Sequence, residues 1–174
     1  MKIALIVLAV LAALVALLAV VGWSLPVKHR AARQVSLAAS PDVVYAAISS
    51  PYAFPSWRSK VTSVEMLPDT EHRPSYREIG GDGNILYVVD AATPPSHLVT
   101  RIADSSLPFG GTWTYDIVPA GAGATLCITE DGEVYNVIFR VMSKYVFGHT
   151  ATIDTYFRDL GRHLDQDVTI TDVT

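Results

Sequence analysis

Cysteine is almost absent from this 174-residue sequence: Cys127 is alone, so no disulfide can form within the chain. Familiar catalytic motifs are absent as well. The stretches ISSP and DSSLP lack the pattern of a nucleophile elbow. GGDGN is followed neither by Lys-Ser/Thr nor by a helix, which excludes a P-loop. None of the five histidines forms a closely spaced, metal-binding pair. We therefore expect no catalytic motif, no metal and no cofactor.

Acidic residues are absent before Asp42, although the chain as a whole has a net charge of −4. The one basic cluster is VKHRAAR, residues 27–33. Proteins that bind nucleic acids usually present a broad basic surface, so we expect no nucleic-acid partner. A short basic cluster next to an apolar segment suits the anionic headgroups of a membrane instead.

An uninterrupted apolar segment lies at the N-terminus. Residues 3–23, IALIVLAVLAALVALLAVVGW, carry no charge. As a helix this segment would be about 30 Å long, enough to cross a bilayer core. It is longer than the apolar region of a signal peptide, which is roughly 7–15 residues. We predict a single-span membrane anchor over residues 1–24, with a cleaved signal peptide as the alternative. Lys2 before the segment and Lys28 after it leave the side of the membrane open.

The remainder predicts one folded domain over residues 34–166, joined to the anchor by a basic linker, residues 25–33, and followed by a tail, residues 167–174. RQVSLAA alternates like a strand, and Ser40 and Pro41 predict the start of a short helix. Strand-like segments follow at residues 59–66, 75–79, 85–91, 97–103, 112–118 and 124–130. The reversals between them, PDTEHRP, GGDGN, TPPS and PAGAG, are short, which favours antiparallel hairpins.

One long amphipathic helix is predicted to end the domain. From Val137 onward, apolar or aromatic residues recur at three- and four-residue spacing, and Asn136 is in position to be the N-cap. A single antiparallel sheet must bury one face, and this helix is the element large enough to cover it. The fold class is therefore α+β, with a sheet that curls around the C-terminal helix.

This order of elements resembles the helix-grip fold of the START, birch-pollen-allergen and polyketide-cyclase superfamily, also called SRPBCC. SPDVVYAAISSPYAFPSWRSKVTSVEML is similar to the opening of that domain, and PPSHLVTRIADSSLPFGGTWTYDIVPAGAGATLCITEDGEVYNVIFR is similar to its later hairpins and the entry to its last helix. The resemblance covers about residues 34–165. It implies a hollow between sheet and helix that holds an apolar or amphipathic ligand. A membrane anchor is not part of the usual domain.

The stretch TEDGEVYNVIFR, residues 129–140, brings three carboxylates together where the sheet is expected to meet the helix. Alternation places Glu130 on the same face as Leu126 and Ile128, directed toward the hollow. Asp131 and Gly132 read as a turn, and Glu133 falls where the positive end of a helix favours negative charge. A simple strand–turn–helix junction, an acid/base or ligand contact for Glu130 or Glu133, and calcium binding are the three alternatives.

The remaining candidate site residues are aromatic rings and one histidine. His149 falls on the apolar stripe of the predicted helix, near Tyr145 and Tyr156, and is either a hydrogen-bonded core histidine, a polar contact in the cavity or a general base. The large rings are expected either to pack beneath the helix or to line the cavity. One face of the sheet can serve both purposes. The full set of ligand-binding candidates is Trp57, Tyr87, Trp113, Tyr115, Glu130, Tyr145, His149 and Tyr156.

The sequence thus predicts a membrane-tethered domain that binds a hydrophobic small molecule or lipid in an internal cavity. An enzyme of cyclase or dehydratase type is the first alternative, with Glu130 and His149 as its acid/base pair within hydrogen-bond reach. An interaction or stress-response scaffold with a filled core is the second.

Overall fold

The computed structural model describes residues 2–173, so the outermost predicted bounds, residues 1 and 174, lie outside it. The elements are α1 (Lys2–Ser24), β1 (Lys28–Leu37), α2 (Pro41–Ile48), a 3₁₀ turn (Pro51–Ser56), β2 (Val61–Thr70), β3 (Arg73–Gly80), β4 (Gly83–Thr93), β5 (His97–Ile102), β6 (Phe109–Ala120), β7 (Gly123–Val134), α3 (Val137–Met142), a π-helical turn (Ser143–Phe147), α4 (Ala151–His163) and β8 (Ile170–Asp172).

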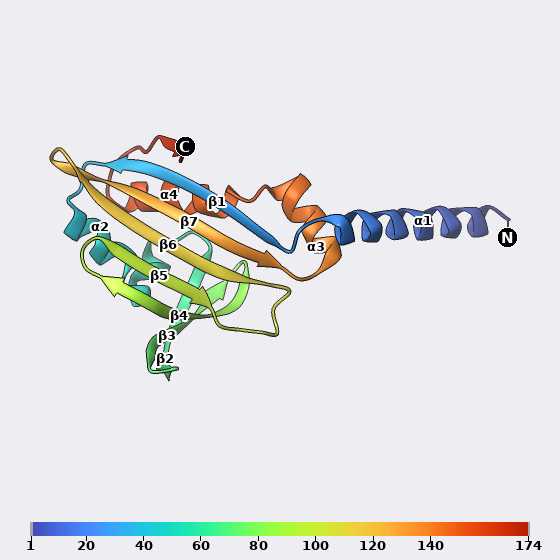
Figure 1. The fold of residues 1–174 in the computed structure, drawn as a ribbon, viewed down its shortest axis with the longest axis horizontal. Coiled ribbons are helices and arrows are strands. Elements are labelled where there is room, and N and C mark those ends of the chain that lie inside the picture. Colours follow the sequence, from blue (N-terminus) through green and yellow to red (C-terminus); the bar gives the residue numbers. More distant parts are fainter. Residues whose placement is uncertain (1, 174) are drawn as a thin grey trace.

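The eight strands form one antiparallel sheet in the order β2-β3-β4-β5-β6-β7-β1-β8. All six strand segments predicted between residues 59 and 130 are present, and the four predicted reversals form four of the five connections between them. The sheet curls, and α4 runs across its inner face beneath β1 and β7 (Figure 1). This is the predicted α+β architecture, which arises because the strands bury only one face.

Helix α1 projects from one end of the sheet as a rod (Figure 1). Its side chains are exposed along nearly its whole length, and it is long and apolar enough to cross a membrane, a property that a signal sequence shares. Only Gly22 is buried, because its Cα faces the backbone of α3.

The predicted linker over residues 25–33 is wrong for most of its length, because β1 begins at Lys28. The basic residues pair across strands with the acidic end of β7: Lys28 lies opposite Glu133 and Arg30 opposite Asp131. Opposite charges on facing strands stabilise the pairing. The predicted turn at Asp131 and Gly132 is also wrong, since both residues lie within β7, which continues to Val134.

The C-terminal helix is interrupted, which corrects the prediction of one continuous helix. Asn136 caps α3 as expected, its side-chain oxygen accepting from the N–H groups of Ile138 and Phe139. The backbone then passes through the π-helical turn and breaks at Gly148, whose φ of 76° is incompatible with a helix. The apolar periodicity runs through this break, so periodicity alone could not locate it. Within the predicted tail, Ile170–Asp172 form β8, which pairs with β1.

The core lies between the inner face of the sheet and the helices α2 and α4. Its fully buried side chains include Val35, Leu126 and Ile128 from the sheet, Val44 from α2, and Ile153, Phe157 and Leu160 from α4. α4 therefore holds one end of the inner face firmly, while the end nearest α1 is covered by the segment around the Gly148 break.

Candidate functional site

Five of the predicted ligand-binding residues meet on the inner face of the sheet. Trp57 follows the 3₁₀ turn, Tyr87 lies on β4, Trp113 and Tyr115 lie on β6, and Tyr156 reaches them from α4. Tyr156 is the centre of this ring cluster: its ring centroid lies 5.3 Å from that of Trp57 and 5.8 Å from those of Trp113 and Tyr115. Phe54 and Tyr76, which sequence reasoning did not select, complete it.

A buried ion pair lies within the ring cluster. The guanidinium of Arg58 bonds the carboxylate of Glu78 on β3, and its Cζ lies 4.9 Å from the ring centroid of Phe54 and 5.0 Å from that of Tyr156. Burial raises the pKa of Glu78 despite the opposing effect of Arg58. Burial lowers the pKa of Arg58, but the charge of Glu78 together with the neighbouring tyrosines outweighs this and raises the pKa, so Arg58 stays protonated.

Sequence reasoning missed this pair. Strand alternation placed Glu78 on the same face as Tyr76, which was the available signal. Arg58 follows Trp57 in an irregular segment, where no periodicity assigns a direction to a side chain.

Two buried hydrogen-bonding groups in the ring cluster form no hydrogen bond of normal geometry within the described residues: the indole N–H of Trp57 and the hydroxyl of Tyr156. The hydroxyls of Tyr156 and Tyr115 are still close enough to shift each other's pKa. Tyr156 is 3% exposed and Trp57 is 9% exposed. Burial raises the pKa of Tyr156 well above its ordinary value and that of Tyr115 to about 12, so both hydroxyls keep their protons at neutral pH. The cluster thus combines apolar ring faces with two buried donors that could serve a ligand oxygen.

The end of the inner face nearest α1 carries a second group of polar residues. Nε2 of His29, on β1, lies 3.3 Å from Oε1 of Glu130 on β7. The ring of His149 stacks on that of His29 at 4.0 Å between centroids, and Nδ1 of His149 lies 3.2 Å from the hydroxyl of Ser143. Glu130 is therefore on the inner face as predicted, but its partner is His29, which the sequence placed in a linker.

The stacked histidines make one pH-dependent prediction. Burial, followed by the charge of His29, lowers the pKa of His149 below its ordinary 6.5. A lowered histidine pKa favours the neutral form in the fold, so this contribution to stability is complete above pH 6.5 and is lost as the pH falls toward the folded-state pKa. We expect melting temperatures measured in detergent between about pH 7.5 and about pH 5 to fall less steeply for His149→Gln than for the parent. His72→Gln, at an exposed turn, is the control. Parallel curves for all three proteins would contradict the assignment.

Tyr145 does not join either group. It lies in the π-helical turn and is 63% exposed. It shared the predicted apolar stripe with His149 and Tyr156, but the break at Gly148 separates the turn that carries it from α4.

Two of the pockets in the described residues lie beside the polar group at the α1 end, and neither is lined by the ring cluster. The larger, about 540 Å³, is at the α1 end of the sheet and is lined by Lys28, His29, Arg101, Ile102, Gly111, Thr112, Asp131, Gly132, Glu133 and Tyr135. The smaller, about 20 Å³, lies between His29, His149 and the residues after α1. No cluster of metal-binding side chains occurs in residues 2–173.

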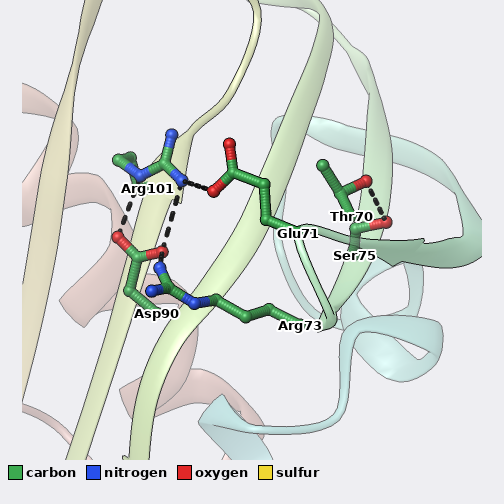
Figure 2. Close-up of polar contacts among 6 residues, drawn as sticks. All are labelled: Thr70, Glu71, Arg73, Ser75, Asp90 and Arg101. Atoms are coloured by element: carbon green, nitrogen blue, oxygen red, sulfur yellow. Dashed lines mark hydrogen bonds and ion pairs between the residues drawn. The ribbon is translucent and has the colours of Figure 1, made fainter.

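Beside the larger pocket, an ion-pair network joins the outer faces of β4 and β5 to the β2–β3 turn (Figure 2). Asp90 accepts from Nε of Arg101 at 2.9 Å and from Nη1 of Arg73 at 2.5 Å, and Arg101 also donates to Glu71 at 3.1 Å. Partial burial opposes ionisation of Asp90, but the two guanidinium groups prevail and lower its pKa. The network holds the β2–β3 turn in place. Its positive and negative charges already balance one another, so Arg101 has little freedom to bind an anion.

A family model for polyketide cyclase/dehydrase and lipid transport matches residues 28–155, from the start of β1 to Thr155 in α4, one residue before Tyr156. The chain belongs to the polyketide cyclase/dehydrase and lipid transport family. A comparison with curated proteins finds no match.

Solved structures agree with this family assignment at the level of the fold. A START superfamily protein from Mycobacterium smegmatis is 18% identical with a TM-score of 0.62, covering 79% of this chain and 97% of that one. The ginseng major latex-like protein 151 from Panax ginseng is 11% identical with a TM-score of 0.62, covering 79% and 98%. The di-domain ARO/CYC StfQ of steffimycin biosynthesis is 14% identical with a TM-score of 0.60; the match covers 80% of this chain and 50% of StfQ. The predicted helix-grip fold is confirmed.

Within this polyketide cyclase/dehydrase and lipid transport domain, the family model begins at Lys28. The family segment thus includes the basic strand residues and His29 that the sequence reading assigned to a linker. Helix α1 lies before it, as expected of an element outside the usual domain.

Proposed function

We propose that this protein binds a hydrophobic small molecule or lipid on the inner face of its sheet, and that α1 tethers the binding domain to a membrane. The observation that carries the proposal is the pair of buried donors on Trp57 and Tyr156, neither of which forms a hydrogen bond of normal geometry within the described residues. Leaving a buried donor unpaired costs about 1–3 kcal/mol, and an oxygen of a bound ligand would remove that cost. Family membership supports the same conclusion.

The donors also define the chemistry of the ligand. Both groups donate, so the ligand presents a carbonyl, carboxyl or ether oxygen to them, and its apolar body lies against the surrounding rings. Arg58 beside them is neutralised by Glu78, so a net negative charge on the ligand is not required. Apolar burial supplies most of the affinity, at about 25 cal/mol per Å².

Trp57, Tyr115 and Tyr156 are each less than 10% exposed, so a ligand reaches the buried donors only if side chains move. A membrane tether would favour binding of such a ligand. Apolar molecules concentrate in the bilayer, and the tether keeps the domain beside that supply. The interruption at Gly148 separates α3 from α4 and gives the α1 end of the inner face a cover that is not one rigid helix.

The proposal is tested by purifying the full chain in detergent and identifying co-purified molecules by solvent extraction and native mass spectrometry. We expect a reproducible amphiphile with one polar end. Tyr156→Phe removes one donor and keeps the ring, so it should weaken binding of that amphiphile about 2- to 12-fold, the equivalent of one hydrogen bond. Tyr52→Phe, at a tyrosine that is 75% exposed, should change nothing.

The same substitution has an opposite effect on the ligand-free protein. Removing an unpaired buried hydroxyl should leave its free energy of unfolding unchanged or higher. If no amphiphile co-purifies and Tyr156→Phe behaves like Tyr52→Phe, the interior is a filled core and the protein is a scaffold.

An enzymatic function is the second candidate, favoured by the half-buried Glu130–His29 contact. The expected direct pairing of Glu130 with His149 is not formed, because His29 lies between them. A cyclase or dehydratase would therefore use His29 with Glu130, and Glu130→Gln would abolish turnover of the extracted ligand while leaving its binding intact.

A further inference from the structure

An exposed apolar and aromatic surface surrounds the base of α1. It comprises Trp23 at the end of α1 together with Tyr135, Ile138, Phe139, Tyr145 and Val146 from the segment after β7; we call the part on residues 135–146 the basal surface. Trp23 is 81% exposed, and Tyr145 and Val146 are each more than 60% exposed. Large apolar side chains gathered this way on a monomer indicate an interaction surface.

The basal surface is joined to α1 by close packing and by hydrogen bonds. A Cβ on Gly22 would lie 2.0 Å from the carbonyl oxygen of Val137, so only glycine allows the two helices to approach this closely. Nη1 of Arg140 donates to the carbonyl oxygens of Gly22 and Leu25 at 3.1 Å each, and Nη2 donates to that of Tyr135 at 3.0 Å. These bonds join α3 to the C-terminal end of α1 and to Leu25, the residue that follows it.

The charge and composition around this surface match the headgroup layer of a bilayer. Lys144 lies in the π-helical turn, with its ammonium 5.5 Å from the ring centroid of Tyr145, and Lys28 and Arg30 are exposed at the same end of the sheet. Tryptophan and tyrosine concentrate at membrane interfaces, where their rings are partly apolar and partly hydrated. Lys28 and Arg30 are paired with Glu133 and Asp131, whereas Lys144 has no ion pair within residues 2–173. The attraction to anionic lipids, about 1 kcal/mol for each free basic side chain, therefore comes mainly from Lys144.

We infer that the basal surface inserts into the headgroup region of the same bilayer that α1 crosses, so that the domain is seated with the α1 end of its sheet against the membrane. This inference rests on the proposed tether. The occupant is lipid rather than a second protein because the surface is continuous with α1, whose exposed length is itself apolar on every side. The seating places the His29–His149 end of the inner face next to the lipid, where a ligand would enter.

The seating is tested in the full chain, in a Cys127→Ser background, reconstituted in vesicles of phosphatidylcholine and phosphatidylglycerol. Single labels of the fluorophore NBD are introduced at Val146→Cys or Ile138→Cys in the basal surface, at Leu11→Cys in α1, and at Val43→Cys in α2. Val43 is an exposed valine like Val146, but α2 lies at the opposite end of β1 (Figure 1), about 33 Å away for a ten-residue strand.

Nitroxide lipids report depth. We expect a nitroxide near the headgroup end of the acyl chain to quench most of the fluorescence at positions 146 and 138, a nitroxide at the far end to quench position 11, and neither to quench position 43. Quenching at position 11 without quenching at 146 and 138 overturns the seating and leaves the tether intact. No quenching at any position overturns the tether and the seating together.

Discussion

Arg58→Met should destabilise the protein by about 3–5 kcal/mol, because it leaves the Glu78 carboxylate buried without its partner. Glu78 is 7% exposed, and its only ionic contact in the described residues is with Arg58. Urea denaturation of the full chain in detergent micelles, followed by tryptophan fluorescence, measures the loss. The control is Arg77→Met, which breaks the exposed Arg77–Glu65 pair on the neighbouring strands and should cost less than about 1 kcal/mol.

The double substitution Arg58→Met/Glu78→Met separates the loss of a contact from the isolation of a charge. Replacing both members of a buried pair with apolar side chains of similar size is often neutral or stabilising. We therefore expect the double variant to recover most of the stability lost in the single variant. A double variant as unstable as Arg58→Met would show that packing of the arginine stem, and not charge, is what matters.

The pH dependence of Arg58→Met provides an independent check. Burial already raises the pKa of Glu78 in the parent. A carboxyl whose folded-state pKa is raised contributes stability below its unfolded pKa, near 4.5, and loses it as the pH rises through the folded pKa. Without Arg58 the pKa rises further. The single variant should then regain stability as the pH is lowered from about 7 toward about 5, and the double variant should not.

Asp159→Ala should cost about 3–6 kcal/mol, since the buried carboxylate accepts two hydrogen bonds from Ser59 and charge-assisted bonds contribute about 1.5–3 kcal/mol each. Its Oδ2 accepts from the backbone N–H of Ser59 at 2.7 Å and from the Ser59 hydroxyl at 2.8 Å. These bonds join α4 to the segment that carries Trp57 and Arg58. We therefore expect weaker binding of the extracted amphiphile as well as a lower urea midpoint.

Arg162→Ala is the matched control for Asp159. Arg162 bonds the other carboxylate oxygen from a side chain that is 71% exposed, and the two bonds from Ser59 remain when it is removed. Its removal should therefore cost less than Asp159→Ala and leave binding unchanged. Equal losses in the two variants would mean that the surface ion pair, and not the link to Ser59, supports the site.

Much of the fold could be predicted because its strands are short and separated by clear reversals. Period-two alternation located β2 through β7, and it also placed Glu130, Trp113 and Tyr115 on the inner face. The same reasoning failed at Lys28, where a run of positive charge looked like a linker. Those charges become compatible with a strand only when the acidic end of β7 lies beside them, and no local pattern contains that information.

The sequence by itself determined the apolar N-terminal helix, the antiparallel sheet and the amphipathic C-terminal segment, because each is encoded by a local periodicity or by length. Only the tertiary structure decided the partners: His29 with Glu130, Arg58 with Glu78, and Arg140 with the end of α1. The physical reason is that an ion pair or hydrogen bond between distant residues depends on strand register and helix position. The break at Gly148 is also decided by the tertiary structure. The backbone angle there separates α3, which is joined to α1, from α4, which packs on the sheet.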